Sequence, residues 1–115
     1  MKVIVAGSRG FNNYDLLKET LDDLRKYIED ISIVSGTARG ADLLGERYAN
    51  ENGLKIHRFK PDWSVGKKAG YLRNKEMAEF ADALVAFWDG DSRGTKHMID
   101  LAKNKKLKVK IVRYV

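Results

Sequence analysis

Five short runs along the chain consist mainly of Val, Ile, Leu and aromatic residues. Such residues favour β-strands, and short runs of them bounded by Gly, Asn, Asp and Ser are typical of strands. The runs cover residues 2–6, 31–35, 54–59, 83–88 and 107–114. The pattern therefore predicts five strands.

The segments between these runs carry apolar residues at helical spacing. In the first, residues 14–28, the apolar residues recur at intervals of three and four, which predicts an amphipathic helix. They are Leu17, Leu21, Leu24 and Ile28. Asn13 or Asn12 is available to cap the N-terminus of this helix. Three further helices are predicted at residues 41–52, 67–80 and 95–104.

Strand and helix thus alternate from one end of the chain to the other, with short connections. Alternation of this kind implies right-handed crossovers and a parallel sheet that is covered by helices on both faces. We expect one Rossmann-like α/β domain over residues 1–115, with three layers and a five-stranded, mainly parallel sheet. In such open sheets the ligand binds outside the carboxyl ends of the strands.

The composition narrows the class of protein. The 115 residues suffice for one domain, and cysteine is absent, which excludes a disulfide framework and a thiolate nucleophile. The longest apolar stretches, such as residues 83–88, are far shorter than the roughly 20 residues that span a bilayer. There is also no basic and then apolar segment at the N-terminus. We therefore expect a cytoplasmic protein that does not enter a membrane.

The net charge of +6 resides in one segment. Residues 96–115 hold seven lysines and arginines against one aspartate, whereas the charges of the preceding residues balance. A lysine cluster could bind nucleic acid by releasing counterions. The favoured interpretation is structural: Lys108 and Lys110 point outward from an edge strand, while Leu107, Val109 and Ile111 point inward, and the charges prevent edge-to-edge pairing.

Three of the apolar runs are followed by glycines, small polar residues and an arginine. A strand that ends in such a loop and then starts a helix leaves free N–H groups at the positive end of the helix dipole, where phosphates and carboxylates bind. The sequence therefore predicts an anion-binding site. Its candidate residues in these loops are Gly7, Ser8, Arg9, Ser35, Gly36, Thr37, Arg39, Gly40, Ser92, Arg93, Gly94 and Thr95.

Arg73 on the third predicted helix is a further candidate, because a guanidinium offers planar paired donors to phosphate. A solvated residue, or an ion pair with Glu76 or Glu79, is an equally good interpretation of Arg73.

Asp42 is assigned a structural role, as a hydrogen-bond acceptor for loop amides or a partner of the helix dipole. Asp89, like Asp62 and Asp91, could bind sugar hydroxyls or act as a base, although Asp91 fits turn chemistry better.

Four aromatic residues could stack on a base. Trp88 ends an apolar strand and is expected in the core, as are most such residues. Trp63, in a Pro-Asp-Trp loop, is the better stacking candidate. The other two are Phe11 and Tyr71.

Several kinds of site are excluded. The first loop is not the dinucleotide fingerprint G-x-G-x-x-G, and Ser35-Gly36 stands where an acidic residue would hold a ribose, which argues against a nicotinamide dehydrogenase. His57 and His97 lack partners at metal-ligand spacing, and the serines lack a His and Asp triad. We expect neither a metal nor a separate cofactor.

Four motifs, taken in order and spacing, resemble the SLOG superfamily, the Rossmann-like group that includes DprA/Smf and the LOG proteins, and most closely its short YspA/YpsA-like members. They are Ala6-Gly7-Ser8-Arg9, residues 35–42 from Ser35 to Asp42, Arg73-Asn74 followed by Met77-Ala78, and Ser92-Arg93-Gly94-Thr95. The resemblance implies a nucleotide ligand with its phosphate over residues 36–40 and 93–95, contacted by Arg73 and with Asn74 beside it. It also implies a dimer or larger homo-oligomer.

One departure bears on activity. LOG enzymes cut the N-glycosidic bond of nucleoside monophosphates and carry glutamates shortly after a Gly-Gly-x-Gly-Thr loop, whereas Gly94-Thr95 is followed here by Lys96, His97 and Met98. The sequence therefore predicts binding or sensing of a small-molecule nucleotide or nucleotide derivative, such as a nucleoside phosphate or an ADP-ribose-like ligand. The alternatives are a phosphoribohydrolase that uses Asp89 or Asp91, and single-stranded nucleic-acid binding through the basic C-terminal segment.

Overall fold

Five strands form one sheet in the order β3-β2-β1-β4-β5 in a computed structural model that describes residues 1–114. Every neighbouring pair is parallel, so the five carboxyl ends lie at the same edge of the sheet. The strand order changes direction between the central strands β1 and β4. The strands are β1 (Lys2–Gly7), β2 (Ser32–Ser35), β3 (Ile56–Arg58), β4 (Ala83–Trp88) and β5 (Lys108–Arg113).

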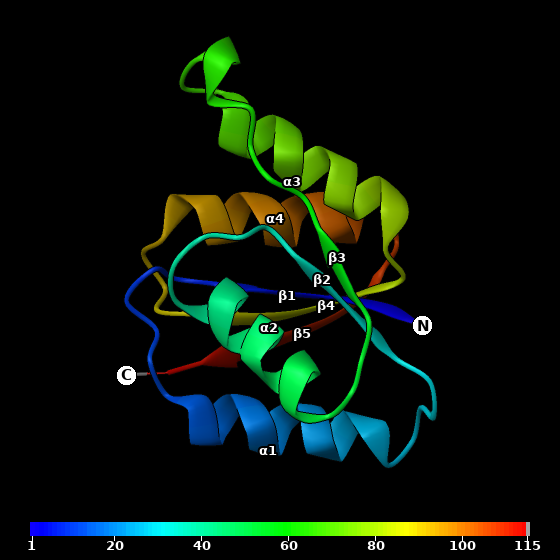
Figure 1. The fold of residues 1–115 in the computed structure, drawn as a ribbon. Helices are drawn as coiled ribbons and strands as arrows, with labels where there is room; N and C mark the ends of the chain where they lie inside the picture. Colours follow the sequence, from blue (N-terminus) through cyan, green and yellow to red (C-terminus); the bar gives the residue numbers. More distant parts are fainter. Residues whose placement is uncertain (115) are drawn as a thin grey trace.

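Helices cover both faces of the sheet (Figure 1). Helices α1 and α2 pack on one face, and α3 and α4 pack on the other. This arrangement confirms the predicted three-layer α/β domain, with a sheet that is parallel throughout. The helices are α1 (Tyr14–Arg25), α2 (Ala41–Glu51), α3 (Ala69–Phe80) and α4 (Arg93–Asn104), with a short 3₁₀ helix, η1 (Trp63–Val65), before α3.

The core consists of two apolar layers separated by the sheet. Side chains of β1 point alternately into each layer, because successive residues of a strand face opposite sides. On the first face, Val3 and Val5 contact the cluster of α1 and α2, and on the second face Ile4 contacts that of α3 and α4. These β1 residues are fully buried. The predicted apolar stripe of α1 supplies Leu17 and Leu21 to the first layer.

Helix boundaries differ from the prediction where local hydrogen bonds decide them. Helix α1 ends at Arg25 rather than at residue 28, since the amides of Lys26 and Tyr27 turn back to carbonyls three residues earlier. Helix α4 begins two residues earlier than expected because Ser92 caps it, with Thr95 N donating to Ser92 Oγ at 3.3 Å. The cap predicted at Asn13 is confirmed: its Oδ1 accepts from Leu16 N at 3.0 Å.

The lysine-rich strand β5 lies at an edge of the sheet, paired only with β4. Lys108 and Lys110 are exposed, and Val109 is partly buried, as the structural interpretation expects. Ile111 pairs in register with Ala86 and therefore lies on the same face as Val109, as predicted, but 37% of this residue remains exposed. An edge strand has a neighbour on one side only, so its apolar residues are less completely covered. Lys108 pairs in register with Ala83, at the amino end of the sheet and away from the strand carboxyl ends.

Candidate functional site

Three loops meet at the carboxyl edge of the sheet, after β1, β2 and β4. The amide of Ser8 donates to the Phe87 carbonyl at 3.1 Å, and the Ser8 hydroxyl accepts from Asp89 N at 3.3 Å. Gly40 lies so close to the first loop that a Cβ there would overlap the Ser8 carbonyl oxygen. The chain thus brings together the glycine loops that the sequence singled out.

The glycines of these loops serve different purposes. A Cβ on Gly36 would lie 2.8 Å from both Arg73 Nη1 and Asp42 Oδ2, so this glycine lets the two side chains approach the loop. Gly7 permits close packing between β1, β4 and the start of α2, as discussed below. Gly10 and Gly94 face open space. Three of the four predicted ligand-binding glycines, Gly7, Gly36 and Gly40, therefore have clear packing functions.

A hollow of about 400 Å³ lies beside the β2–α2 loop. Four cationic side chains line it, and none of the described residues that line it is acidic. Such a surface attracts anions, because the positive charges add in a confined space. Its lining residues are Arg9, Gly36, Thr37, Ala38, Arg39, Lys60, Pro61, Trp63 and Arg73.

Arg73 joins helix α3 to this loop. Its Nη1 donates to the Gly36 carbonyl, and its Nε donates to Asn74 Oδ1 at 2.9 Å. The side chain is half-buried, and burial lowers the pKa of its guanidinium. It therefore turns toward the loop rather than extending into solvent or pairing with Glu76, and its remaining N–H donors face the hollow's edge.

The N-terminus of α2 opens beside the same loop without a side-chain cap. Gly40 occupies the cap position with φ of +82° and offers no side-chain acceptor. Thr37 has φ of +66°, which is uncommon for a β-branched residue and marks a constrained backbone. An uncapped helix N-terminus favours a bound anion. Two amides of the loop are already bonded within the chain, Thr37 N to Ser35 Oγ and Ala38 N to Asp42 Oδ2, so an anion here uses the remaining donors.

Ser35 lies beneath this loop. It is fully buried, and its hydroxyl accepts a hydrogen bond from Thr37 N at 3.0 Å while donating one to Glu46 at 2.7 Å. Glu46 is also paired with Arg58 at 2.8 Å. Ser35 therefore positions the loop from beneath.

A second hollow, of about 100 Å³, adjoins the first and shares Arg9, Ala38 and Arg73 with it. It is lined in addition by Asp42, Asn74, Ser92, Gly94 and Thr95, together with apolar residues of the sheet and helices. The side chain of Asn74 lies 3.3 Å from His97 Nδ1, which fixes it against α4. Arg9 and Arg73 thus lie at the boundary between the larger, cationic hollow and the smaller, polar hollow.

Asp42 is the one buried acidic residue among residues 1–114, with 5% of its surface exposed. Its Oδ2 accepts a bond from Ala38 N at 3.2 Å, as the structural assignment predicted. Burial raises the pKa of this carboxyl to about 6, although the bond from Ala38 and the charge of Arg73 oppose the rise. Near neutral pH the site therefore contains a carboxyl group that is poised to exchange a proton.

The β4–α4 loop is organised around Asp89. Its Oδ1 accepts from the amides of Asp91 and Ser92, each at 2.8 Å, and these bonds lower the pKa of Asp89. Neither Asp89 nor Arg93 lines either hollow, and Arg93 is exposed in the first turn of α4. Of the predicted site residues, the structure also leaves Ser8, Ser35 and Gly40 outside both hollows.

The four aromatic residues considered for stacking on a base differ in exposure. Trp63 remains 60% exposed on the wall of the larger hollow. The stacking role considered for Phe11 is wrong, because this residue is buried and its ring stacks on Phe87 at 4.8 Å between centroids. Tyr71 packs edge-on against His97 at 4.5 Å, and Trp88 is partly buried against the core, as expected.

The sequence did not single out Lys60, Pro61 or Ala38 as individual ligand-binding residues, although all three line the larger hollow. A signal for the first two was present, because they directly follow β3 and therefore lie at the carboxyl edge. Ala38 carries no chemical signal. It lines the site because its backbone forms the loop.

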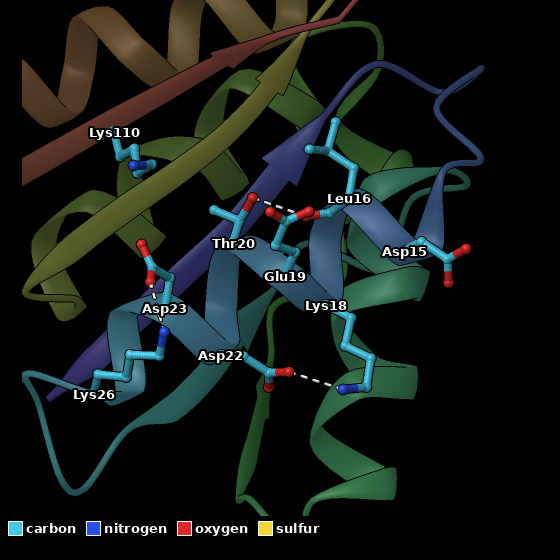
Figure 2. Close-up of a pocket in the computed structure, with 9 residues that line it drawn as sticks. All are labelled: Asp15, Leu16, Lys18, Glu19, Thr20, Asp22, Asp23, Lys26 and Lys110. Atoms are coloured by element: carbon cyan, nitrogen blue, oxygen red, sulfur yellow. Dashed lines mark hydrogen bonds and ion pairs between the residues drawn. The ribbon is translucent and has the colours of Figure 1, made fainter.

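A larger hollow of about 550 Å³ lies elsewhere, along α1 and beside Lys110 of β5 (Figure 2). Its walls are mostly exposed side chains of both charge signs, which pair with one another, as Lys18 with Asp22 at 2.8 Å and Lys26 with Asp23 at 3.3 Å. It contains none of the glycine loops. We therefore place the candidate site at the strand carboxyl ends, despite the smaller volume there.

Comparison with known protein families gives the family of this chain. A family model described as the YspA, cpYpsA-related SLOG family matches residues 1–66. The chain belongs to this family. The match spans the first two glycine loops and Lys60 to Trp63, and it confirms the resemblance to the SLOG group.

Two individual proteins extend the comparison. Gene 61 protein of Mycobacterium phage D29 is 37% identical over 105 residues, covering 84% of this chain and 83% of that protein. The X-ray structure of DNA processing protein A (DprA) from Streptococcus pneumoniae aligns with 99% of this chain at a TM-score of 0.81 and 19% identity. This chain spans 50% of that DprA chain, and the likeness shows a shared fold.

Residues 1–114 include no helix with the length and apolar character that a bilayer crossing requires. Over the same residues, no three or more His, Asp or Glu side chains gather as a metal site would need.

Proposed function

We propose that this protein binds a nucleotide or nucleotide derivative, such as a nucleoside phosphate or an ADP-ribose-like molecule, at the carboxyl ends of β1, β2 and β4. One observation carries the proposal: the guanidinium of Arg73 reaches from α3 to the β2–α2 loop, beside the uncapped N-terminus of α2. Membership of the SLOG family, which suggests nucleotide-related binding or processing, supports the same conclusion.

The proposed pose follows the chemistry of the two hollows. In this pose a phosphate accepts bonds from free amides of the β2–α2 loop and from Arg9, Arg39 and Arg73, all of which line the larger hollow. A base stacks on the exposed face of Trp63. The polar side chains of the smaller hollow, such as Asn74, are available to sugar hydroxyls.

Replacing Arg73 with alanine is expected to weaken nucleotide binding at least tenfold, since a charge-assisted bond to phosphate is worth about 1.5 kcal/mol or more. Arg93→Ala is the matched control, because it removes the same charge nearby but lines neither hollow. We expect it to change the dissociation constant by less than about threefold, as for an exposed surface charge.

The measurement is isothermal titration of AMP, ADP and ADP-ribose into each protein, with adenosine as the ligand that lacks phosphate. Tighter binding of the phosphorylated ligands, lost in Arg73→Ala alone, supports the pose. Equal weakening by both substitutions would mean that the arginines act only through overall charge. No binding by any member of the panel to the unmodified protein would refute the proposed function.

A second candidate, hydrolysis of the N-glycosidic bond in the same site, is favoured by Asp42. Its carboxyl lines the smaller hollow, and its pKa near 6 suits a general acid. The bond between the sugar carbon and the base nitrogen would break as Asp42 gives its proton to the departing base. The hydroxyl of a water molecule would add to the sugar carbon and the remaining proton of that water would return to Asp42, leaving free base and a sugar phosphate.

Chromatography of nucleoside monophosphates after incubation with the protein tests this reaction. We expect Asp42→Asn to abolish base release while leaving nucleotide binding within about threefold of the unmodified protein, since an amide keeps the shape of the carboxyl. Intact nucleotide after prolonged incubation with the unmodified protein would exclude the reaction and leave the binding proposal in place.

A further inference from the structure

Helices α3 and α4 lie side by side on one face of the sheet (Figure 1), and the buried side chain of Asn74 connects them. The Oδ1 of Asn74 accepts a hydrogen bond from Arg73 Nε at 2.9 Å. Its Nδ2 donates to the Gly94 carbonyl oxygen at 3.5 Å and lies 3.3 Å from His97 Nδ1. Only 6% of Asn74 is exposed, and leaving a buried amide without one of these partners is costly. The amide of Asn74 is therefore held from both ends.

His97 completes this contact only as a neutral ring with its proton on Nε2. The Nδ2 of Asn74 is a donor, so a hydrogen bond from it requires a lone pair on His97 Nδ1. Burial lowers the pKa of His97 from its ordinary 6.5, although the charge of Asp100 opposes the change, so the neutral ring predominates at pH 7. From α3, Tyr71 packs edge-on against the ring at 4.5 Å between centroids. Two side chains of α3 thus fix the ring of His97.

Arg73 lies at the other end of the same chain of hydrogen bonds. Its Nε is part of the planar guanidinium, so the bond from Nε to Asn74 Oδ1 limits how that plane can turn. In this orientation Arg73 Nη1 donates to the Gly36 carbonyl oxygen. The chain of hydrogen bonds therefore runs from α4, through α3, to the β2–α2 loop beside the larger hollow. His97 itself lines neither hollow, so it reaches a ligand there only through other residues.

We propose that His97 positions Arg73 for the ligand: through Asn74, the neutral imidazole holds the guanidinium at the β2–α2 loop. The inference rests on the proposed nucleotide site and adds to it a residue that lies outside the hollows. A proton on His97 Nδ1 would place two donors against each other. Asn74 would then have to turn its Oδ1 toward His97, and the hydrogen bond from Arg73 Nε would be lost. Protonation of His97 is thus expected to weaken ligand binding.

Other charged groups act on the two ends of this chain of hydrogen bonds. Asp42 from α2 and Arg9 from the loop after β1 act on the guanidinium. On α4, Asp100 acts on His97 and is itself paired with Lys96 at 2.8 Å. Because Asp42 also titrates near neutral pH, variants have to be compared at the same pH, so that the contribution of Asp42 cancels.

Two substitutions at His97 separate its hydrogen bond from the bulk of its ring. His97→Leu removes the acceptor and is expected to weaken binding of AMP, ADP or ADP-ribose about fivefold, as for the loss of one hydrogen bond. His97→Asn offers its Oδ1 near the position of Nδ1, without a charge at any pH, and should bind within about twofold of the unmodified protein. Isothermal titration measures both, and circular dichroism checks that each variant is folded. Equal weakening by the two substitutions would contradict the proposal.

The double variant Arg73→Ala/His97→Leu tests whether His97 acts through Arg73. Once the guanidinium is absent, His97→Leu should change the dissociation constant by less than about twofold, because the residue that it positions is gone. A residue that only stabilises α4 would add its full effect to that of Arg73→Ala. Full additivity would therefore show that His97 has no positioning role.

The pH profile is a readout that a loss of packing would not change. ADP-ribose is the probe, because each of its phosphates carries two substituents and keeps its charge between about pH 5 and 7.5, whereas a phosphate monoester titrates at about 6. Relative to His97→Asn, the unmodified protein should lose affinity below pH 6.5. A direct attraction between protonated His97 and the phosphates would give the opposite sign and would refute the role of Asn74. His57→Asn, at the second histidine of the chain, is the control and should keep the unmodified profile.

Nitrogen NMR spectroscopy of the ligand-free protein distinguishes failure of this inference from failure of the proposed function. At about pH 7.5, His97 should carry its proton on Nε2 and none on Nδ1. A proton on Nδ1 would overturn this inference alone, even where nucleotides bind. Absence of binding by AMP, ADP and ADP-ribose would overturn the proposed function and, with it, the role of His97.

Discussion

Gly7→Ala is expected to lower the free energy of unfolding by about 3 kcal/mol or more, the largest loss of stability that we predict for a single methyl group in this protein. The added Cβ would overlap the Phe87 carbonyl oxygen and lie 2.8 Å from Ala41 Cβ. Neither neighbour can move freely, because the first is backbone of β4 and accepts a bond from Ser8 N. The methyl group must therefore separate β1 from β4 or displace the start of α2.

Thermal and urea unfolding measure this loss. For a domain of this size, 3 kcal/mol corresponds to a decrease in Tm of roughly 10 °C. Gly10→Ala is the control three residues away, where nothing lies within 4 Å of the added Cβ. It should change stability by less than about 0.5 kcal/mol. Similar losses in the two variants would show that Gly7 is replaceable and that its contacts do not limit packing.

Asp42→Asn is expected to stabilise the protein above pH 7 by about 3 kcal/mol. Burial raises the pKa of Asp42 from its ordinary 3.8 to about 6. Between these pH values the folded protein retains a proton that the unfolded chain has lost, so ionised Asp42 increasingly destabilises the fold as the pH rises from about 4 to 6. The shift of about two pH units corresponds to the stated free energy. An asparagine avoids the buried charge and can still accept from Ala38 N.

The measurement is urea unfolding of both proteins between pH 4 and 8, compared as a difference so that other titrating groups cancel. The advantage of Asp42→Asn should be full above about pH 7 and disappear toward pH 4. Asp89→Asn serves as the control of opposite sign, because amide bonds lower the pKa of Asp89 and favour its charged form. A difference between Asp42→Asn and the unmodified protein that is independent of pH would show that Asp42 titrates normally.

Gly7→Ala tests the packing that supports the site, and Asp42→Asn tests a titratable group within it. Gly7 holds β1, β4 and α2 at the distance that brings three loops together, whereas Asp42 carries a cost in stability at neutral pH. A carboxyl that is kept buried at such a cost points to a role in the site. Asp42 lines the smaller hollow, under the loop that Arg73 contacts, which is the position that the proposed hydrolysis requires.

The pattern of residues predicted much of the fold because the relevant signals are local. Alternating apolar runs and helical repeats define the order of elements, and side-chain caps such as Asn13 act within a few residues. The sequence missed η1, a single short turn whose cap, Asp62, accepts from Ser64 N at 3.1 Å. A turn of three residues has too little periodicity to be recognised in advance.

The sequence predicts where the candidate site lies but not which residues form it. Because carboxyl ends of parallel strands meet at one edge, the glycine loops after β1 and β2 were expected at the same edge of the sheet. Which arginine faces the hollow depends on how each helix is rotated against the sheet. Arg73 contacts Gly36 from α3, while Arg93, with an equally suggestive sequence, is exposed on α4.

By itself the sequence determined the succession of strands and helices, the glycine- and arginine-containing loops that connect them and the family of the chain, since these depend on local pattern and motif spacing. Only the tertiary structure decided the sheet order, the burial of Asp42 and Phe11 and the contact of Arg73 with the β2–α2 loop. Burial and side-chain contact arise from packing between segments that lie far apart in the chain, and no local pattern specifies them.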